Sequence, residues 1–207
     1  KITYELNTSV SDDKIVHNLI LRGSNDKMVV AHHDVSNHLT DNANDNSASV
    51  INAIALKKLM PELNVVLLDG EEVGGQGSKV ISQQINDGEF GVIKWVLNLE
   101  LTGKGGTNFF IGNYNGELSK HITNLFKCPV YNTPFNDSVI FRENGIDSTV
   151  INPLPILKKG KSSVIYNGKY LDDSILYNCH SKRDTMDTIS VDDMKAFVEE
   201  VLLKILK

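Results

Sequence analysis

The stretch VVLLDGEEVGG, from Val65 to Gly75, joins four consecutive apolar residues to a pair of glutamates and a pair of glycines. A continuous apolar run of this kind is typical of a central strand whose two faces are both covered. The run from Val29 to Ala31 has the same character. We therefore predict two strands in the middle of a sheet, one of which ends in adjacent carboxylates.

Short β-rich runs alternate with amphipathic stretches along most of the chain, which is the pattern of a layered α/β domain with helices on both faces of a sheet. The last helix is indicated by apolar residues at helical spacing, with Ser190 and Asp193 as an N-terminal cap. Strands are expected at residues 2–10, 14–21, 28–31, 65–69, 95–101, 108–111 and 149–151, and helices at about 47–60, 78–86, 117–126 and 191–206.

Length and composition limit the number of domains and the kind of partner. The chain has 207 residues, 41% of them hydrophobic, which suffices for one sizeable core and not for two. We expect a single domain over residues 1–207. The formal net charge of -5, with no basic stripe, argues against a nucleic-acid partner.

The sequence also lacks the marks of a membrane or signal segment. No apolar run approaches the ~18 residues needed to cross a bilayer, and the first residues have no apolar signal-peptide core. We expect a soluble protein with no membrane partner. Because the chain begins at Lys1 rather than at a Met, a longer precursor remains open, as do a cytoplasmic or secreted location and the oligomeric state.

Several active-site types find no support. Cys128 and Cys179 are the only cysteines, and neither belongs to a C-x-x-C pair, so any metal must be held by His and carboxylates. A thiol nucleophile at Cys179 is disfavoured because neighbours on an extended segment, such as His180, face apart. The G-x-S-x-G elbow and the H-E-x-x-H helix are absent, and the Gly-Lys-Ser at 160–162 lacks the upstream Gly of a P-loop. The lysines around it are interpreted as solvated surface.

Two candidate ligand positions lie in the first quarter of the chain. His32 follows the strand at 28–31, and Asp34, two residues on, suits a carboxylate that orients a metal-bound His, although a surface turn would look the same. Asp45 stands at the start of a helix, where capping is the ordinary role. Its loop does not fit an EF-hand, because Ala43 and Asn46 occupy positions that need a ligand and a Gly.

Four further candidates follow, of which the adjacent glutamates give the sharpest signal. Glu71 and Glu72 repel each other at the end of a buried strand, so a cation beside them is expected, and adjacent side chains can divide metal binding from general base catalysis. Glu100 lies inside an otherwise apolar strand, where an acid is costly unless it is paired, hydrogen-bonded or metal-bound. His180 taken alone would be a structural histidine.

The order of these motifs, H-x-D, N-D-N, E-E-x-G, N-L-E and H-x-x-x-D-T, resembles metallopeptidase family 28. That family includes bacterial leucyl-type aminopeptidases, glutamate carboxypeptidase II-like enzymes and glutaminyl cyclases. The resemblance covers about residues 15 to 206 and extends to the segment from Asn136 to Ile146. It implies a three-layer α/β/α sandwich of the zinc-exopeptidase type, with a central mixed, mostly parallel sheet.

The resemblance also implies a role for each candidate. One zinc would be bound by His32 and Glu100 and a second by Glu72 and His180, giving two Zn²⁺ per chain. Asp45 would bridge them. Glu71 would be the general base, and Asp34 would orient the first histidine.

Three positions depart from the family pattern, and one of them, Ser49 in place of the usual Gly, matters little. Glu100 stands where aminopeptidases of the family more often have Asp, and its longer side chain still reaches a metal. Cys179 stands where some relatives have a Tyr that polarises the scissile carbonyl, so Tyr166 or Tyr177 is a candidate substitute.

The predicted function is a two-zinc aminopeptidase that removes the N-terminal residue of a peptide, with a metal-bridging water as nucleophile. Three alternatives stay open: a single-zinc glutaminyl cyclase-like acyltransferase, an amidase or deacetylase, and a catalytically silent binding domain on the same fold. Cobalt or manganese would satisfy the same ligands as zinc.

Overall fold

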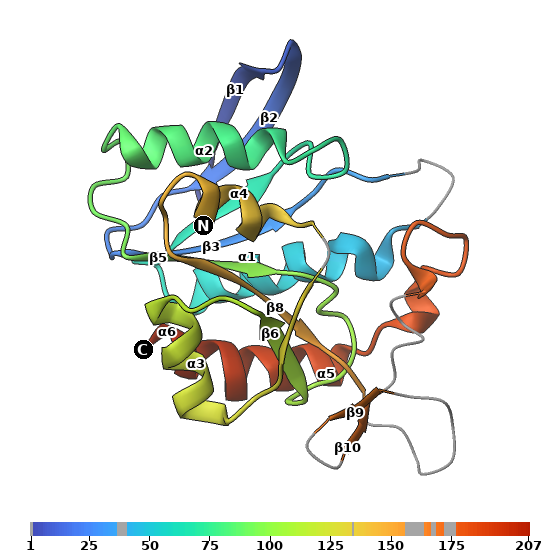
Figure 1. Cartoon of the computed structure of the whole chain (residues 1–207). Helices are drawn as coiled ribbons and strands as arrows, with labels where there is room; N and C mark the ends of the chain where they lie inside the picture. Colours follow the sequence, from blue (N-terminus) through green and yellow to red (C-terminus); the bar gives the residue numbers. More distant parts are fainter. Residues whose placement is uncertain (1, 37–40, 134, 156–163, 167–168, 172–176) are drawn as a thin grey trace.

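The computed structural model describes residues 2–36, 41–133, 135–155, 164–166, 169–171 and 177–207 (Figure 1). The lysine loop around residues 158–161 and the side chain of Tyr166 lie outside what is described.

A mixed sheet of eight strands forms the middle layer, in the order β1-β2-β4-β3-β5-β8-β6-β7. The inner strands β4, β3, β5 and β8 run parallel, whereas β1, β2 and β6 pair antiparallel with their neighbours at β1-β2, β2-β4 and β8-β6. The strands are β1 (Glu5–Ser11), β2 (Lys14–Leu21), β3 (Lys27–His32), β4 (Asn64–Leu68), β5 (Trp95–Leu99), β6 (Phe109–Gly112), β7 (Val130–Tyr131) and β8 (Ser148–Pro153). The mixed, mostly parallel sheet is as predicted.

Helices cover both faces of this sheet and complete the predicted three layers (Figure 1). One hydrophobic cluster joins the sheet to α1, α3 and the C-terminal helical segment, and a second joins its other face to α2 and α4. The helices are α1 (Ala48–Leu59), α2 (Gln76–Asn86), α3 (Glu117–Phe126), α4 (Asp137–Glu143) and a C-terminal segment made of α5 (Val191–Ala196), η4 (Phe197–Leu202) and α6 (Leu203–Leu206).

The two apolar runs lie in the middle of the sheet because their alternate residues serve both faces. Val29 of β3 and Val65 of β4 pack in the first cluster, whereas Val30 and Val66 pack in the second. All four side chains are fully buried. A strand that faces two cores needs apolar residues at every position, which is why these runs do not alternate.

Some boundaries and short elements differ from expectation. The first strand begins at Glu5, and the fifth ends at Leu99, which leaves Glu100 in the following turn. The helix expected from residue 47 starts at Ala48, after an irregular turn, η1 (Ala43–Ser47). Five short elements in the described part of the chain were not predicted from the sequence: β7, α4, the hairpin strands β9 (Val164–Tyr166) and β10 (Lys169–Leu171), and the turn η3 (Met186–Thr188). Each has seven residues or fewer, too few for a periodic pattern to emerge.

The topology brings the charged motifs to one edge of the sheet. The parallel strands β3, β4 and β5 end at this edge, and β3 lies between the other two. From β3 the chain passes through α1 to β4 on one side, and from β4 through α2 to β5 on the other. Open α/β sheets bind ligands at such a change of direction. In the described part of the chain, no helix has the length and hydropathy to cross a membrane.

Candidate metal centre

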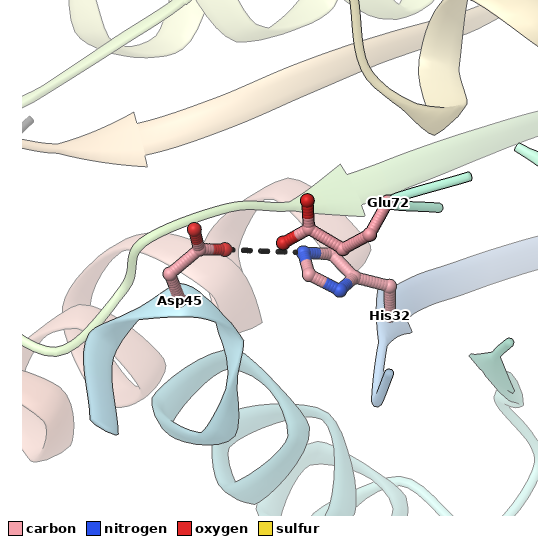
Figure 2. Close-up of side chains that lie close together, drawn as sticks. All are labelled: His32, Asp45 and Glu72. Carbon is pink, nitrogen blue, oxygen red and sulfur yellow. Dashed lines mark ion pairs between the residues drawn. The ribbon is translucent and has the colours of Figure 1, made fainter. Parts of the chain in front are cut away.

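Five side chains meet at the carboxyl edge of the central strands. His32 is the last residue of β3, Glu72 follows β4, and Glu100 directly follows β5. Asp45 comes from η1, and His180 from the loop that leads to η3. Figure 2 shows the imidazole of the first histidine and two of the carboxylates pointing toward one another. The structure therefore brings together every residue that the sequence analysis nominated as a ligand.

Asp45 lies between the two histidines and presents a different oxygen to each. Its Oδ1 is 3.3 Å from Nε2 of His32, and its Oδ2 is 3.2 Å from Nε2 of His180. A second carboxylate approaches each imidazole: Glu100 Oε2 lies 3.6 Å from the first Nε2 and Glu72 Oε2 lies 3.1 Å from the second. The five side chains thus form two groups of three that share one carboxylate.

The chemistry of this donor set suits a cation. His32, Asp45 and Glu72 each offer a ligand atom within 4.8 Å of the others, so these three could hold a metal ion. The second oxygen of Glu72 is buried without a hydrogen-bond partner. Among the described residues that line the site there is no lysine or arginine. Buried carboxylates without a positive partner are costly, and imidazole with carboxylate is a common ligand set for zinc.

The electrostatic field at the site is strongly negative. Burial alone would lower the pKa of His32, but the carboxylates of Glu100, Asp34 and Asp45 outweigh it and hold that pKa well above its usual value. Burial, followed by the charge of Glu100, raises the pKa of Glu71 to about 9. Both shifts show how much a positive charge is favoured here, and a bound cation would favour the ionised form of each nearby acid.

Asp34 holds two parts of the site together, as a carboxylate next to a metal-bound histidine is expected to do. Its Oδ1 lies 3.4 Å from Nδ1 of His32. Its two oxygens also accept hydrogen bonds from the peptide N–H groups of Glu71 and Glu72, at 3.2 and 3.1 Å. In the turn that carries the two glutamates, Gly70 has a φ of 73°, a backbone conformation that residues other than glycine rarely adopt.

Asn46 holds the turn around Glu100 in a similar way. Its side-chain amide donates to the carbonyl of Leu99 at 3.0 Å and accepts from the N–H of Leu101 at 3.2 Å, so it bonds the peptide groups on either side of the glutamate. Leu101 has a φ of 53°. The peptide bond before Asn46 is cis.

Asp184 is a third side chain that binds two peptide groups of the site. In the sequence it was only one letter of the H-x-x-x-D-T motif. Its Oδ1 accepts from the N–H of Asn44 at 2.8 Å and its Oδ2 from the N–H of Asp45 at 2.9 Å. The side chain is 1% exposed. Its position four residues after His180 was visible in the sequence, but no local pattern showed that its partners are ~140 residues earlier.

A cavity of about 430 Å³ opens over the metal centre. Glu71 lines it beside the proposed ligands, and so does Cys179. Tyr177 is 70% exposed and does not line it, so the structure gives no support to that tyrosine as a substitute for the family's carbonyl-polarising group. Away from the ligands the wall is largely apolar and consists of Leu101, Phe110, Phe135 and Val150, with Thr133, Asn136 and Asn152 between them.

Comparison with known proteins places the chain in a family and a fold. The family model described as Peptidase family M28 matches residues 18–205. A zinc aminopeptidase from Bacillus subtilis superposes with a TM-score of 0.71 at 15% identity, over 94% of this chain and 50% of that one. The LapA aminopeptidase of Legionella pneumophila gives a TM-score of 0.68 at 12% identity, over 98% of this chain and 57% of that one.

A third solved structure is a glutaminyl cyclase from Bacteroides thetaiotaomicron bound to N-acetylhistamine. It gives a TM-score of 0.65 at 16% identity, over 98% of this chain and 82% of that one. The present chain thus spans 50% and 57% of the length of the two aminopeptidases and 82% of the cyclase. A search of the curated proteins found no match to the sequence.

Proposed function

The chain belongs to peptidase family M28, and on that premise we propose that it is a zinc-dependent aminopeptidase with two metal positions that share Asp45. The observation that carries the proposal is that the two oxygens of this carboxylate face different histidines: Oδ1 faces His32 and Oδ2 faces His180. One carboxylate between two imidazoles suits a pair of cations about 3.5 to 4 Å apart.

Each position takes one further carboxylate in this proposal. His32 and Glu100 bind the first ion, and His180 and Glu72 bind the second, as their separations of 3.6 and 3.1 Å support. When bound, the two zinc ions supply a water of lowered pKa and positive charge beside the scissile carbonyl.

Glu71 is the proposed general base. It lines the cavity beside the proposed ligands, and the carboxylate of Asp34 accepts a hydrogen bond from its peptide N–H. From this position the carboxylate of Glu71 takes a proton from the attacking water and later delivers it to the leaving amine. Asp34 keeps Nδ1 of His32 directed away from the metal, so that Nε2 is free to bind.

The proposed substrate is a peptide with a free N-terminus. Its amine is attracted by the carboxylates around the metal positions, and the apolar wall of the cavity favours an uncharged N-terminal side chain. Among the described residues, that wall carries no cation that would bind the α-carboxylate of a C-terminal residue.

A glutaminyl cyclase-like acyltransferase is the second candidate, because the cyclase structure is covered to 82% of its length. The retention of ligands for both positions favours the two-metal hydrolase over a one-zinc cyclase. An amidase or deacetylase would use the same chemistry and differ only in the shape of its pocket. A silent binding domain is disfavoured because all five proposed ligands and the base are present.

Zinc content measured together with turnover tests the proposal. The wild type and Glu71→Gln are assayed for zinc per chain and for hydrolysis of a panel of chromogenic amino-acid amides. We expect two zinc ions in both proteins and a loss of about 10²- to 10⁴-fold in kcat for the variant, as for removal of a general base.

The same assay separates the alternatives. One zinc per chain, with cyclisation of an N-terminal glutamine, would instead establish the cyclase. Two zinc ions without turnover of any amide would point to a specialised substrate. A chain that binds no metal would overturn the mechanism and leave only the fold.

A further inference from the structure

The loop that carries His180 is the least protected part of the metal centre. The side chain of His180 is 58% exposed, whereas those of His32 and Glu100 are 2% and 12% exposed. His32 ends a central strand and Glu100 directly follows another, so the sheet itself fixes the first metal position. At the second position, a contact outside the sheet must hold the histidine at the site.

Short-range hydrogen bonds make residues 178 to 184 one compact unit. The N–H of Ser181 donates to the carbonyl of Asn178 at 3.2 Å, and the N–H of Asp184 donates to the carbonyl of Ser181 at 3.0 Å. The hydroxyl of Ser181 also donates to the carbonyl of Asn178, at 2.7 Å. Because His180 lies inside these turns, whatever fixes Asp184 also fixes the imidazole.

Asp184 is fixed to the loop of the shared ligand. Each of its carboxylate oxygens accepts from one of two consecutive peptide N–H groups, those of Asn44 and Asp45. Hydrogen bonds to a carboxylate are shorter and stronger than neutral ones, and two in parallel also set the orientation. The contact therefore joins the backbone of the shared ligand to the loop of the exposed histidine.

We infer that Asp184 is a positioning residue that holds His180 and Asp45 in register, and that it governs zinc binding at the second position selectively. The inference rests on the proposed two-metal function. Loss of Asp184 should free the 178–184 unit from η1, so that His180 no longer faces Glu72 and Asp45 together. His32 and Glu100 keep their own supports, Asp34 and Asn46. Asn46 belongs to η1, as Asp45 does, but its side chain is hydrogen-bonded to the peptide groups of Leu99 and Leu101.

The main test variant is Asp184→Asn, which is isosteric but has one acceptor oxygen and an NH₂ group that would face a peptide N–H. Asp187→Asn is the control, because it removes the same charge from an exposed side chain three residues further on. Asp184→Glu keeps both acceptor oxygens on a longer side chain. This variant tests the same contact if Asp184→Asn does not fold. Urea unfolding of each metal-free protein shows whether the variant is folded.

Zinc occupancy of each position is measured in crystals equilibrated at limiting zinc, from anomalous scattering at the zinc edge, with zinc affinities in solution from calorimetry. For Asp184→Asn we expect the affinity of the Glu72 and His180 position to fall about 10- to 100-fold, the usual effect of removing a group that supports a ligand. The His32 and Glu100 position should weaken by a smaller factor. Asp184→Glu should show the same selectivity to a lesser degree, and Asp187→Asn should match the wild type.

Three results would overturn the inference. If Asp184→Asn lowers the zinc affinity of both positions equally, Asp184 has a general structural role. If zinc binding is unchanged at both positions, Asp184 has no positioning role. In either case a wild type with two zinc ions leaves the proposed function intact. A wild type that holds a single ion would overturn the two-position arrangement itself and the role of Asp184 with it.

Discussion

At the scale of single residues, the site depends on carboxylates that are placed where water does not stabilise their charge. Glu72 and Asp45 face imidazoles, and Asp34 and Asp184 each bind two peptide N–H groups. The ligand types were recognisable from their motifs. The backbone partners of Asp184 were not, because a hydrogen bond to an N–H group ~140 residues away leaves no local signature.

Asp137, the first residue of α4, is a buried carboxyl group whose ionisation should destabilise the folded protein. This leads to a prediction for the pH dependence of stability. The side chain is 0% exposed, and burial raises its pKa from 3.8 to about 7. Between these values the folded protein binds more protons than the unfolded chain, so this group lowers the free energy of unfolding as pH rises from about 4 to about 7. Asp137→Asn should therefore stabilise the metal-free protein at pH 8 and have little effect near pH 4.

Urea unfolding of both metal-free proteins at several pH values measures this difference. Asp192→Asn is the matched control, because it makes the same change at an exposed position in the first turn of α5. A pH-independent effect of Asp137→Asn would contradict the assignment.

At the scale of elements, the sequence pattern was sufficient where an element is long enough to show a period or a continuous apolar run. The four predicted helices and seven predicted strands are all present, with shifts at their ends. The ends differ because they depend on contacts outside the element: η1 before α1 is held by Asp184 rather than by a cap of its own. The missed β7 pairs with β6 and has two residues, which cannot show a period.

The cap of the C-terminal helical segment is an element-level prediction that the structure bears out. The hydroxyl of Ser190 accepts from the N–H of Asp193 at 3.3 Å. Ser190→Ala leaves that N–H without its side-chain partner and should lower the free energy of unfolding by about 1 kcal/mol, the usual value for a lost N-cap.

Chemical denaturation gives the number, and Ser190→Asp, which restores an acceptor, is the control. An Ala variant as stable as the wild type would show that water replaces the hydroxyl without loss.

At the scale of the whole molecule, the proposed metal centre joins parts of the chain that are far apart in sequence. Its proposed ligands come from β3, η1, the turns after β4 and β5, and the loop that precedes η3. Ions bound there would connect the central sheet to the loop of His180. Occupied metal positions should therefore stabilise the fold as a whole.

Removal of zinc should lower the urea midpoint and the Tm. A ligand that binds only the folded state stabilises it by about 2.7 kcal/mol at 100 times its Kd, and the negative field at His32 and Glu71 adds repulsion once the cations leave. Unfolding is compared with zinc and after chelation, with magnesium as the control ion. Coincident curves with and without zinc would mean that these residues hold no zinc in the folded protein.

Local pattern was enough to identify the layered α/β fold and the two central strands and to nominate the residues of the candidate site, because two-sided burial and buried charge each leave a mark within a few residues. The arrangement of the site depended on the folded chain. From the sequence alone, Asp45 could be a helix cap and His180 a structural histidine. In the folded chain the carboxylate of Asp45 lies 3.3 Å from His32 and 3.2 Å from His180, and His180 lies 3.1 Å from Glu72. Distances between segments 30 to 140 residues apart are set by strand order and packing, and no short stretch of sequence contains them.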